Sequence, residues 1–173
     1  NYLSFNAMKS ESHQVYESFL AKSTDEDYIR YINNLHQSLQ KLLPGNTLPA
    51  VEVVSSRNVT QNLNSLIKRP TVIYFWSTAS KYHFKESHLK VKELRALYPD
   101  MDFVSVNLNS NNNSGWLKML KKEDVPMQNE YRFRDYTIAK TILAINTIWH
   151  VMIVDKNSKI IANTKMFSHE FKD

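Results

Sequence analysis

The residues that could carry chemistry gather in one short segment, VIYFWSTASKYHFKE, at positions 72–86. Within it, the Ser80 hydroxyl precedes the His83 imidazole by three positions, and the Glu86 carboxylate follows at the same spacing. A serine nucleophile needs a histidine that takes its proton and a third group that orients the histidine. At the start of a helix, a serine more commonly caps free backbone N–H groups. We therefore favour a helix cap at Ser80 over a nucleophile.

The composition excludes several other kinds of chemistry. The chain has no cysteine, which rules out thiolate nucleophiles, disulfides and cysteine–metal sites. It has only 2 glycines, which argues against glycine-rich phosphate loops. The net charge of +5 is a mild excess, and acids are interspersed among the lysines, so we predict no nucleic-acid binding. No apolar run is long enough to span a membrane.

The elements that must position this segment alternate between strands and helices from position 44 onward. The apolar run at 71–76 predicts a strand buried on both faces, and residues 80–98 predict a helix that Pro99 ends. The alternating pattern at 101–109 predicts a second strand, which gives a β-α-β crossover. We also expect a strand at 48–56, a turn and one helical turn at 58–70, an exposed extended segment at 130–135, helices at 114–123 and 135–143, and a hairpin of 147–155 with 159–167.

Residues 1–43 predict a helical arm that precedes this α/β domain. Ser23 or Thr24 would cap the longer helix, and acids follow in its first turn. Apolar residues recur at helical spacing in both of its parts: Val15, Phe19 and Leu20, then Ile29, Ile32, Leu35, Leu39 and Leu42. The arm could dock on the domain or on a second copy, so a homo-oligomer through residues 1–43 is one possible outcome.

Residues 44–166 resemble the thioredoxin-like domain of the TlpA/ResA-type thiol-disulfide oxidoreductases. The segments LPGNTLPAVEV, NLNSLIKRPTVIYFWST and VMIVDKNSKII carry the resemblance, in the family's order and spacing. It implies a thioredoxin-like three-layer domain with a mixed β-sheet over 44–173, in which 168–173 would begin a closing helix that the sequence cuts short. It also implies a periplasmic or otherwise extracytoplasmic location.

The resemblance extends to the redox site, but not to the residues that do redox chemistry. Ser80 and His83 stand where the family has its two cysteines, and Trp149 stands where it has a cis-proline. His88 stands at the family's helix-kinking proline. By contrast, Phe75, Trp76 and Glu86 match the family. Because thiol–disulfide exchange requires sulfur, the resemblance implies a redox-inactive member.

Several roles remain open for the former redox groove. Our first hypothesis is a protein- or peptide-binding or scaffolding module, with these residues around the groove: Trp76, Ser80, Tyr82, His83, Trp149 and His150. The alternatives are a non-thiol enzyme with His83 as acid/base beside Glu86 or His150, and a purely structural domain of a larger protein. Trp149 would either fill the groove or line it. Oxidoreductase activity inferred from the fold alone would be analogy.

A metal site is the last alternative, with His83, His88, His150 and Glu86 as candidate ligands. His83 and His88 would point about 140° apart around a helix, so they cannot easily share an ion. The fold that the resemblance implies could bring His83 near Trp149 and His150. Two histidines still fall short of the three or four ligands of a typical site. We therefore expect no metal and no cofactor.

Overall fold

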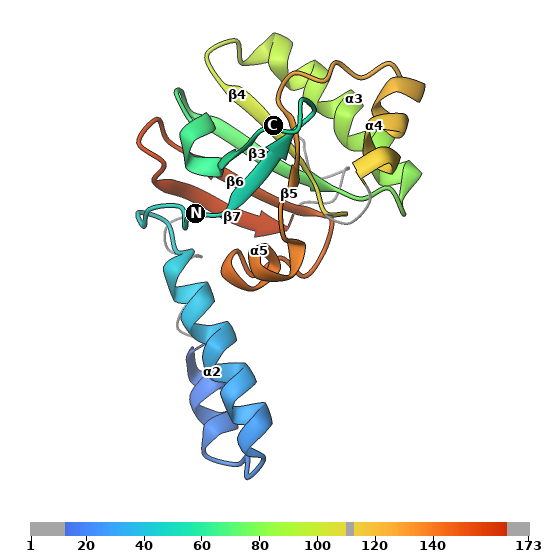
Figure 1. Ribbon diagram of the computed structural model, residues 1–173. Coiled ribbons are helices and arrows are strands. Elements are labelled where there is room, and N and C mark those ends of the chain that lie inside the picture. The colour runs from blue at the N-terminus through green and yellow to red at the C-terminus, as the bar shows by residue number, and fades with distance from the viewer. Residues whose placement is uncertain (1–12, 110–112, 166–173) are drawn as a thin grey trace. The chain divides into compact units, whose positions relative to one another are not determined.

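The computed structural model describes residues 13–109 and 113–165. The chain divides into two compact units, residues 1–40 and 41–173, which are described separately. The predictions made for residues 1–12 of the arm and for a closing helix at 168–173 lie outside the described residues. The second unit carries a mixed β-sheet and the whole of the segment at 72–86 (Figure 1).

The first unit contains a helix over residues 13–20 and the longer helix α2 (Glu26–Lys41). The predicted helices are present, but the predicted cap is wrong. Asp25, not Ser23 or Thr24, caps α2, because its Oδ1 accepts the backbone N–H of Tyr28 at 3.0 Å. A carboxylate suits this place, since it also meets the positive end of the helix dipole.

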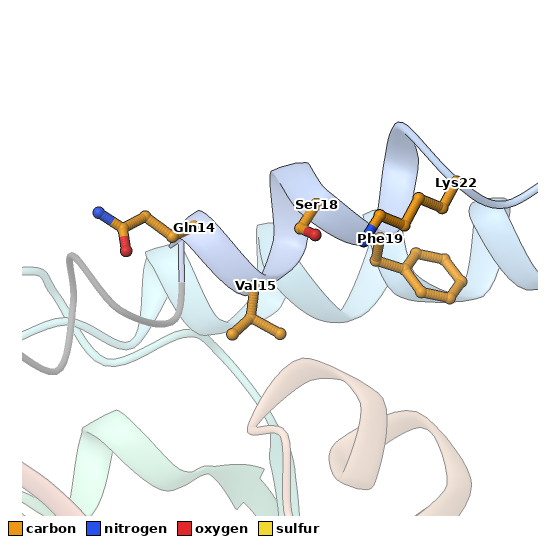
Figure 2. Close-up of a pocket in the computed structure, with 5 residues that line it drawn as sticks. All are labelled: Gln14, Val15, Ser18, Phe19 and Lys22. Carbon is orange, nitrogen blue, oxygen red and sulfur yellow. The ribbon is translucent and has the colours of Figure 1, made fainter.

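Polar and aromatic contacts join the two helices of the first unit. The Tyr16 ring stacks on His36 with centroids 3.9 Å apart, and the Tyr16 hydroxyl donates to Asn33 Oδ1 at 2.7 Å. None of the residues of α2 is fully buried. Val15 and Phe19 project from the same side of the helix at 13–20 and line a shallow pocket (Figure 2). Val15 is 71% exposed, so this face stays apolar and open.

The second unit is built on a sheet whose described strands follow the order β2-β1-β5-β4-β3-β6-β7. Strand β3 pairs in parallel with β4 and antiparallel with β6, which confirms the mixed sheet. The β6–β7 hairpin confirms the predicted final hairpin. The strands are β1 (Glu52–Ser55), β2 (Thr60–Asn62), β3 (Thr71–Trp76), β4 (Asp102–Asn107), β5 (Glu130–Phe133), β6 (His150–Val154) and β7 (Ile160–Lys165).

Helices cover both faces of this sheet and make the three layers that were predicted. Successive side chains of β3 point to opposite faces. Ile73 and Phe75 pack on the side of α5 (Tyr136–Ile142). Tyr74 and Trp76 pack on the side of α3 (Lys81–Leu97) and α4 (Asn113–Lys122). All six residues of β3 are buried, as its continuous apolar run predicts.

Two sequence predictions around the sheet need correction. The segment at 130–135 was expected to be exposed, but β5 lies inside the sheet between β1 and β4, and Glu130 is 2% exposed. Four residues with alternating charges give too weak a pattern to reveal a paired strand. The turn expected before Leu63 is the short strand β2, followed by the 3₁₀ helix Leu63–Leu66.

Candidate functional site

The loop between β3 and α3 is held in place by a single side chain from the next strand's end. Asn109 Oδ1 accepts the Thr78 backbone N–H at 2.8 Å, the Thr78 hydroxyl at 3.0 Å and the Ser77 hydroxyl at 3.1 Å. Asn109 follows β4, which pairs with β3, so the parallel pairing brings it to this loop. No sequence pattern indicates this role of Asn109, because it depends on contacts 31 and 32 positions away along the chain.

Ser80 occupies the N-cap position of α3, as predicted, but its side chain makes no capping hydrogen bond. Its backbone carbonyl accepts the Phe84 N–H at 3.1 Å. His83 Nδ1 is buried without a hydrogen-bond partner, so the His83 ring is not held in a Ser80–His83–acid arrangement. The geometry therefore offers no activated serine.

His83 lies beneath Trp149. Their rings meet edge to face, with centroids 4.3 Å apart and an interplanar angle of 88°. His83 is 4% exposed, and desolvation, followed by the nearby His88, lowers its pKa to about 4. An imidazole in this state is neutral near pH 7 and has little access to a substrate.

Trp149 leaves little open space beside His83. The cavity that remains among His83, Trp149, His150 and the neighbouring core residues has a volume of only about 20 Å³. That is room for about one water molecule. Trp149 itself is half-buried, so its outer face still reaches the surface. The Trp149 peptide bond is trans, like the others in the described residues.

Trp76 and His150 lie inside the fold. The Trp76 indole N–H donates to Ser105 Oγ at 2.8 Å, and Trp76 is fully buried. His150 is 6% exposed, its Nε2 lies 2.5 Å from Asn163 Oδ1, and its ring stands edge-on to Phe75. These two residues can support the site from below, but they offer little surface to a partner.

Tyr82 is the most exposed member of the predicted set, at 67%. Ser80 is half-buried beside it, and Glu86 is half-buried one turn further along α3. The structure therefore brings His83, Trp149 and His150 together, while the surface of the site consists of Ser80, Tyr82 and the outer face of Trp149. We call this set the loop surface.

A buried polar pair between α3 and β5 was not foreseen. His88 Nδ1 lies 2.7 Å from the Phe84 carbonyl oxygen, and His88 Nε2 lies 3.2 Å from Glu130 Oε1. Both side chains are almost fully buried. No local pattern could reveal the pair, since 42 positions separate its members. The only sequence feature that drew attention to His88 was its place at a position where the resembling family has proline.

Metal ligands do not cluster in residues 13–109 and 113–165, where no three histidine or acidic side chains are grouped for an ion. Over the same part of the chain, no helix is both long and apolar enough to cross a membrane.

Comparison with known proteins finds solved structures with a similar fold. No protein-family model and no curated protein matches the sequence. Among solved structures, the chain is similar to the thioredoxin domain of a thiol-disulfide oxidoreductase from Bacteroides vulgatus, with a TM-score of 0.58, 20% identity and coverage of 70% of this chain and 88% of that one. It is also similar to a thiol:disulfide interchange protein from Bacteroides sp., with a TM-score of 0.60, 17% identity and coverage of 71% and 82%.

These similarities show the fold. The chemistry of the site must be argued from the residues themselves. The three layers and the mixed sheet match the fold of thioredoxin-like domains of thiol-disulfide oxidoreductases. The chain has no cysteine, so no thiol stands at that loop. The second unit is therefore a thioredoxin-like domain without the residues of thiol–disulfide exchange.

Proposed function

We propose that the second unit is a redox-inactive protein- or peptide-binding module, and that its contact is the loop surface of Ser80, Tyr82 and Trp149. The observation that carries the proposal is the placement of Tyr82. This large aromatic side chain is 67% exposed on the first turn of α3, beside a loop that Asn109 fixes. Exposed aromatic residues on a rigid support are common anchors of protein interfaces.

The filled groove supports binding more than catalysis. Trp149 rests on His83 and leaves almost no hollow, so a small substrate has no place to enter. A flat or extended partner needs no hollow, because it can lie across the surface. The alternative enzyme with His83 as acid/base is less favoured, because burial leaves this imidazole neutral with a pKa of about 4.

The test uses peptides selected in vitro on the purified full chain. Peptides that bind the native protein should lose roughly tenfold or more in affinity for Tyr82→Ala, as expected for an interface anchor. Tyr98→Ala is the matched control, since Tyr98 is also exposed but follows the far end of α3. Equal binding by the native chain and Tyr82→Ala, or selection of no peptides at all, would count against the loop surface.

The remaining parts of the proposal rest on the family resemblance and on the first unit. The resemblance supports an extracytoplasmic location. The arm at 1–43 would serve as a site of self-association, since Val15, Tyr28 and Tyr31 are more than half exposed. Light scattering of the native chain and of Val15→Glu would show a dimer that the variant loses, whereas a monomer at all concentrations would exclude this role.

A further inference from the structure

A second cavity lies along α3, on the side of this helix that faces the residues after α4. Its volume is about 580 Å³, compared with about 20 Å³ for the space beside Trp149. Its apolar lining consists chiefly of Phe84, Leu89, Val91, Val125 and Pro126. A cavity of this volume with an apolar lining is in the range of small-molecule sites.

Positive charge runs along the α3 wall of this cavity. Because successive residues of a helix turn by about 100°, four cations of α3 fall within an arc of about 80°: Lys81, Lys85, Lys92 and Arg95. The last three of them line the cavity. The two acids of the helix, Glu86 and Glu93, point about 80° or more away from the nearest of these cations. The cations of α3 therefore form a stripe on the cavity side of the helix.

The first half of this stripe is neutralised by an acid of the opposite wall. Lys85 Nζ lies 2.9 Å from Glu123 Oε2, and Lys81 Nζ lies 3.2 Å from Glu123 Oε1. The hydrogen bond from Lys85 is the main reason that the pKa of Glu123 is lowered. Asp124 adds a further negative charge to the same wall. This end of the cavity therefore offers no spare positive charge to a ligand.

The second half of the stripe keeps its charge. Lys92 and Arg95 are three positions apart on α3, so they are neighbours on its surface. Within residues 13–109 and 113–165, neither of them forms a salt bridge with a carboxylate. Arg95 Nη2 donates to the Phe103 carbonyl at 3.3 Å, and the guanidinium carbon lies 5.9 Å from the centre of the Phe103 ring. These contacts hold the guanidinium in place and leave other N–H donors for a ligand.

The floor of the cavity is satisfied within the chain. Glu130 is 2% exposed, and its Oε1 lies 3.2 Å from His88 Nε2. Burial, followed by the charge of Glu130, raises the pKa of Tyr74 well above its ordinary value, so the neutral Tyr74 hydroxyl serves as a hydrogen-bond donor to Glu130. The charge of Arg95 opposes this rise, which indicates that Arg95 lies near the floor. A ligand is therefore selected by the cations at the far end and not by the floor.

We propose that this cavity binds a small monocarboxylic acid with an apolar body, whose carboxylate pairs with Lys92 and Arg95 while its body packs on Phe84, Leu89 and Val91. The guanidinium fork matches the two oxygens of a carboxylate and forms charge-assisted hydrogen bonds with them. A single negative charge suits the cavity better than the double charge of a phosphate, because acidic side chains line its other end. The site does not depend on the loop surface, so either can fail without the other.

The probe is 3-phenylpropionate, with 3-phenylpropan-1-ol and 3-phenylpropylamine as matched neutral and cationic compounds. By NMR titration of the full chain, 3-phenylpropionate should bind with a Kd on the order of 1 mM or tighter. The alcohol should bind roughly tenfold more weakly, and the amine should not bind detectably. Acetate tests the apolar body and should not bind detectably either. The amide signals that shift should belong to residues 84–95 and 123–126.

Charge variants test the two cations. Arg95→Gln should weaken the binding of 3-phenylpropionate roughly tenfold, and Lys92→Gln about threefold, with circular dichroism confirming that each variant is folded. Lys90→Gln is the matched control. It removes the same charge from the same helix, but Lys90 lies outside the lining and pairs with Glu93 at 3.4 Å. This variant should bind 3-phenylpropionate as tightly as the native chain.

Four results would overturn the proposal. The first is no binding of 3-phenylpropionate by the native chain. The second is equal binding of the alcohol or of acetate, which would mean that the charge or the apolar body plays no part. The third is a set of shifted amides away from the cavity. The fourth is an equal loss of affinity in Lys90→Gln and Lys92→Gln, which would reduce the effect to the net charge of the chain.

Discussion

The His83 imidazole stands edge-on to the Trp149 indole, with ring centroids 4.3 Å apart. From the sequence resemblance, His83 was expected at a cysteine position and Trp149 at a proline position of the resembling family. Their contact leaves a cavity of only about 20 Å³ beside the two rings, and it buries the histidine that was proposed from the sequence as an acid/base group.

Trp149→Ala is expected to destabilise the domain, because it removes the aromatic contact and leaves a void above His83. Loss of a half-buried tryptophan of this kind costs on the order of 2–3 kcal/mol. Urea unfolding followed by circular dichroism measures the change. Tyr82→Ala is the control, since Tyr82 is mostly exposed and its loss should change the free energy of unfolding by less than about 0.5 kcal/mol. If both variants lose the same stability, Trp149 does not pack as described.

Stability should fall as the pH drops, because of His83. Its pKa is lowered from 6.5 to about 4 in the folded chain, so between these values the unfolded chain binds the proton and the folded chain does not. The free energy of unfolding is therefore unaffected by His83 above pH 6.5 and decreases as the pH falls from 6.5 to 4. Thermal melts at intervals across this range measure the slope.

His83→Gln is the control for this pH effect. Glutamine has similar polarity but takes up no proton, so the variant should show a shallower loss of stability between pH 6.5 and 4 than the native chain. Other histidines and acids contribute equally to both proteins and cancel in the comparison. Identical slopes for the two would mean that His83 is not protected from protonation in the fold.

Restoring two cysteines should restore a disulfide but little catalysis. Ser80→Cys/His83→Cys places two thiols at the start of α3, where the helix N-terminus favours a thiolate. Oxidised glutathione should convert the pair to an intramolecular disulfide, measured by thiol titration. Insulin reduction should stay low, because Trp149 still fills the groove. Adding Trp149→Pro should raise the rate, whereas equal rates with and without this change would show that Trp149 does not block the site.

Asn109→Ala should loosen the loop before α3. The substitution removes the acceptor of the Thr78 N–H, the Thr78 hydroxyl and the Ser77 hydroxyl. The net cost should be about 1–2 kcal/mol, since partly exposed donors can turn to water. Hydrogen exchange at the Thr78 amide should become faster. Asn157→Ala serves as control, because the Asn157 side chain lies in an exposed turn, and faster Thr78 exchange in that variant would contradict a specific clamp.

The sequence could predict those features that local patterns encode. The apolar run of β3, the helix that ends before Pro99 and the final hairpin each carry a periodic or turn signal, and each is confirmed. The Asn109 clamp carries no such signal. Ser80 takes the predicted N-cap position, but the capping bond of its side chain is absent.

Strand β5 shows why the remainder could not be read from the sequence. Glu130 lies among charged residues in the sequence, a pattern that is typical of an exposed segment. Glu130 is buried only because β5 pairs with β1 and β4. The partner that makes this burial tolerable, His88, lies on another element. Both the strand and the pair depend on contacts that form only when the sheet assembles.

The His88–Glu130 pair yields an asymmetric prediction. His88→Leu should cost about 3 kcal/mol, because it leaves a buried carboxylate without a partner. Glu130→Gln should cost much less, since the amide can donate to His88 Nε2 while Nδ1 keeps its contact with Phe84. His88→Leu/Glu130→Leu should recover much of the loss, because an apolar pair needs no desolvated charge. Urea unfolding of the native chain, the two single variants and the double variant measures the coupling energy between the two side chains. Losses for the single changes that are equal and that add up in the double variant would show that His88 and Glu130 are not coupled.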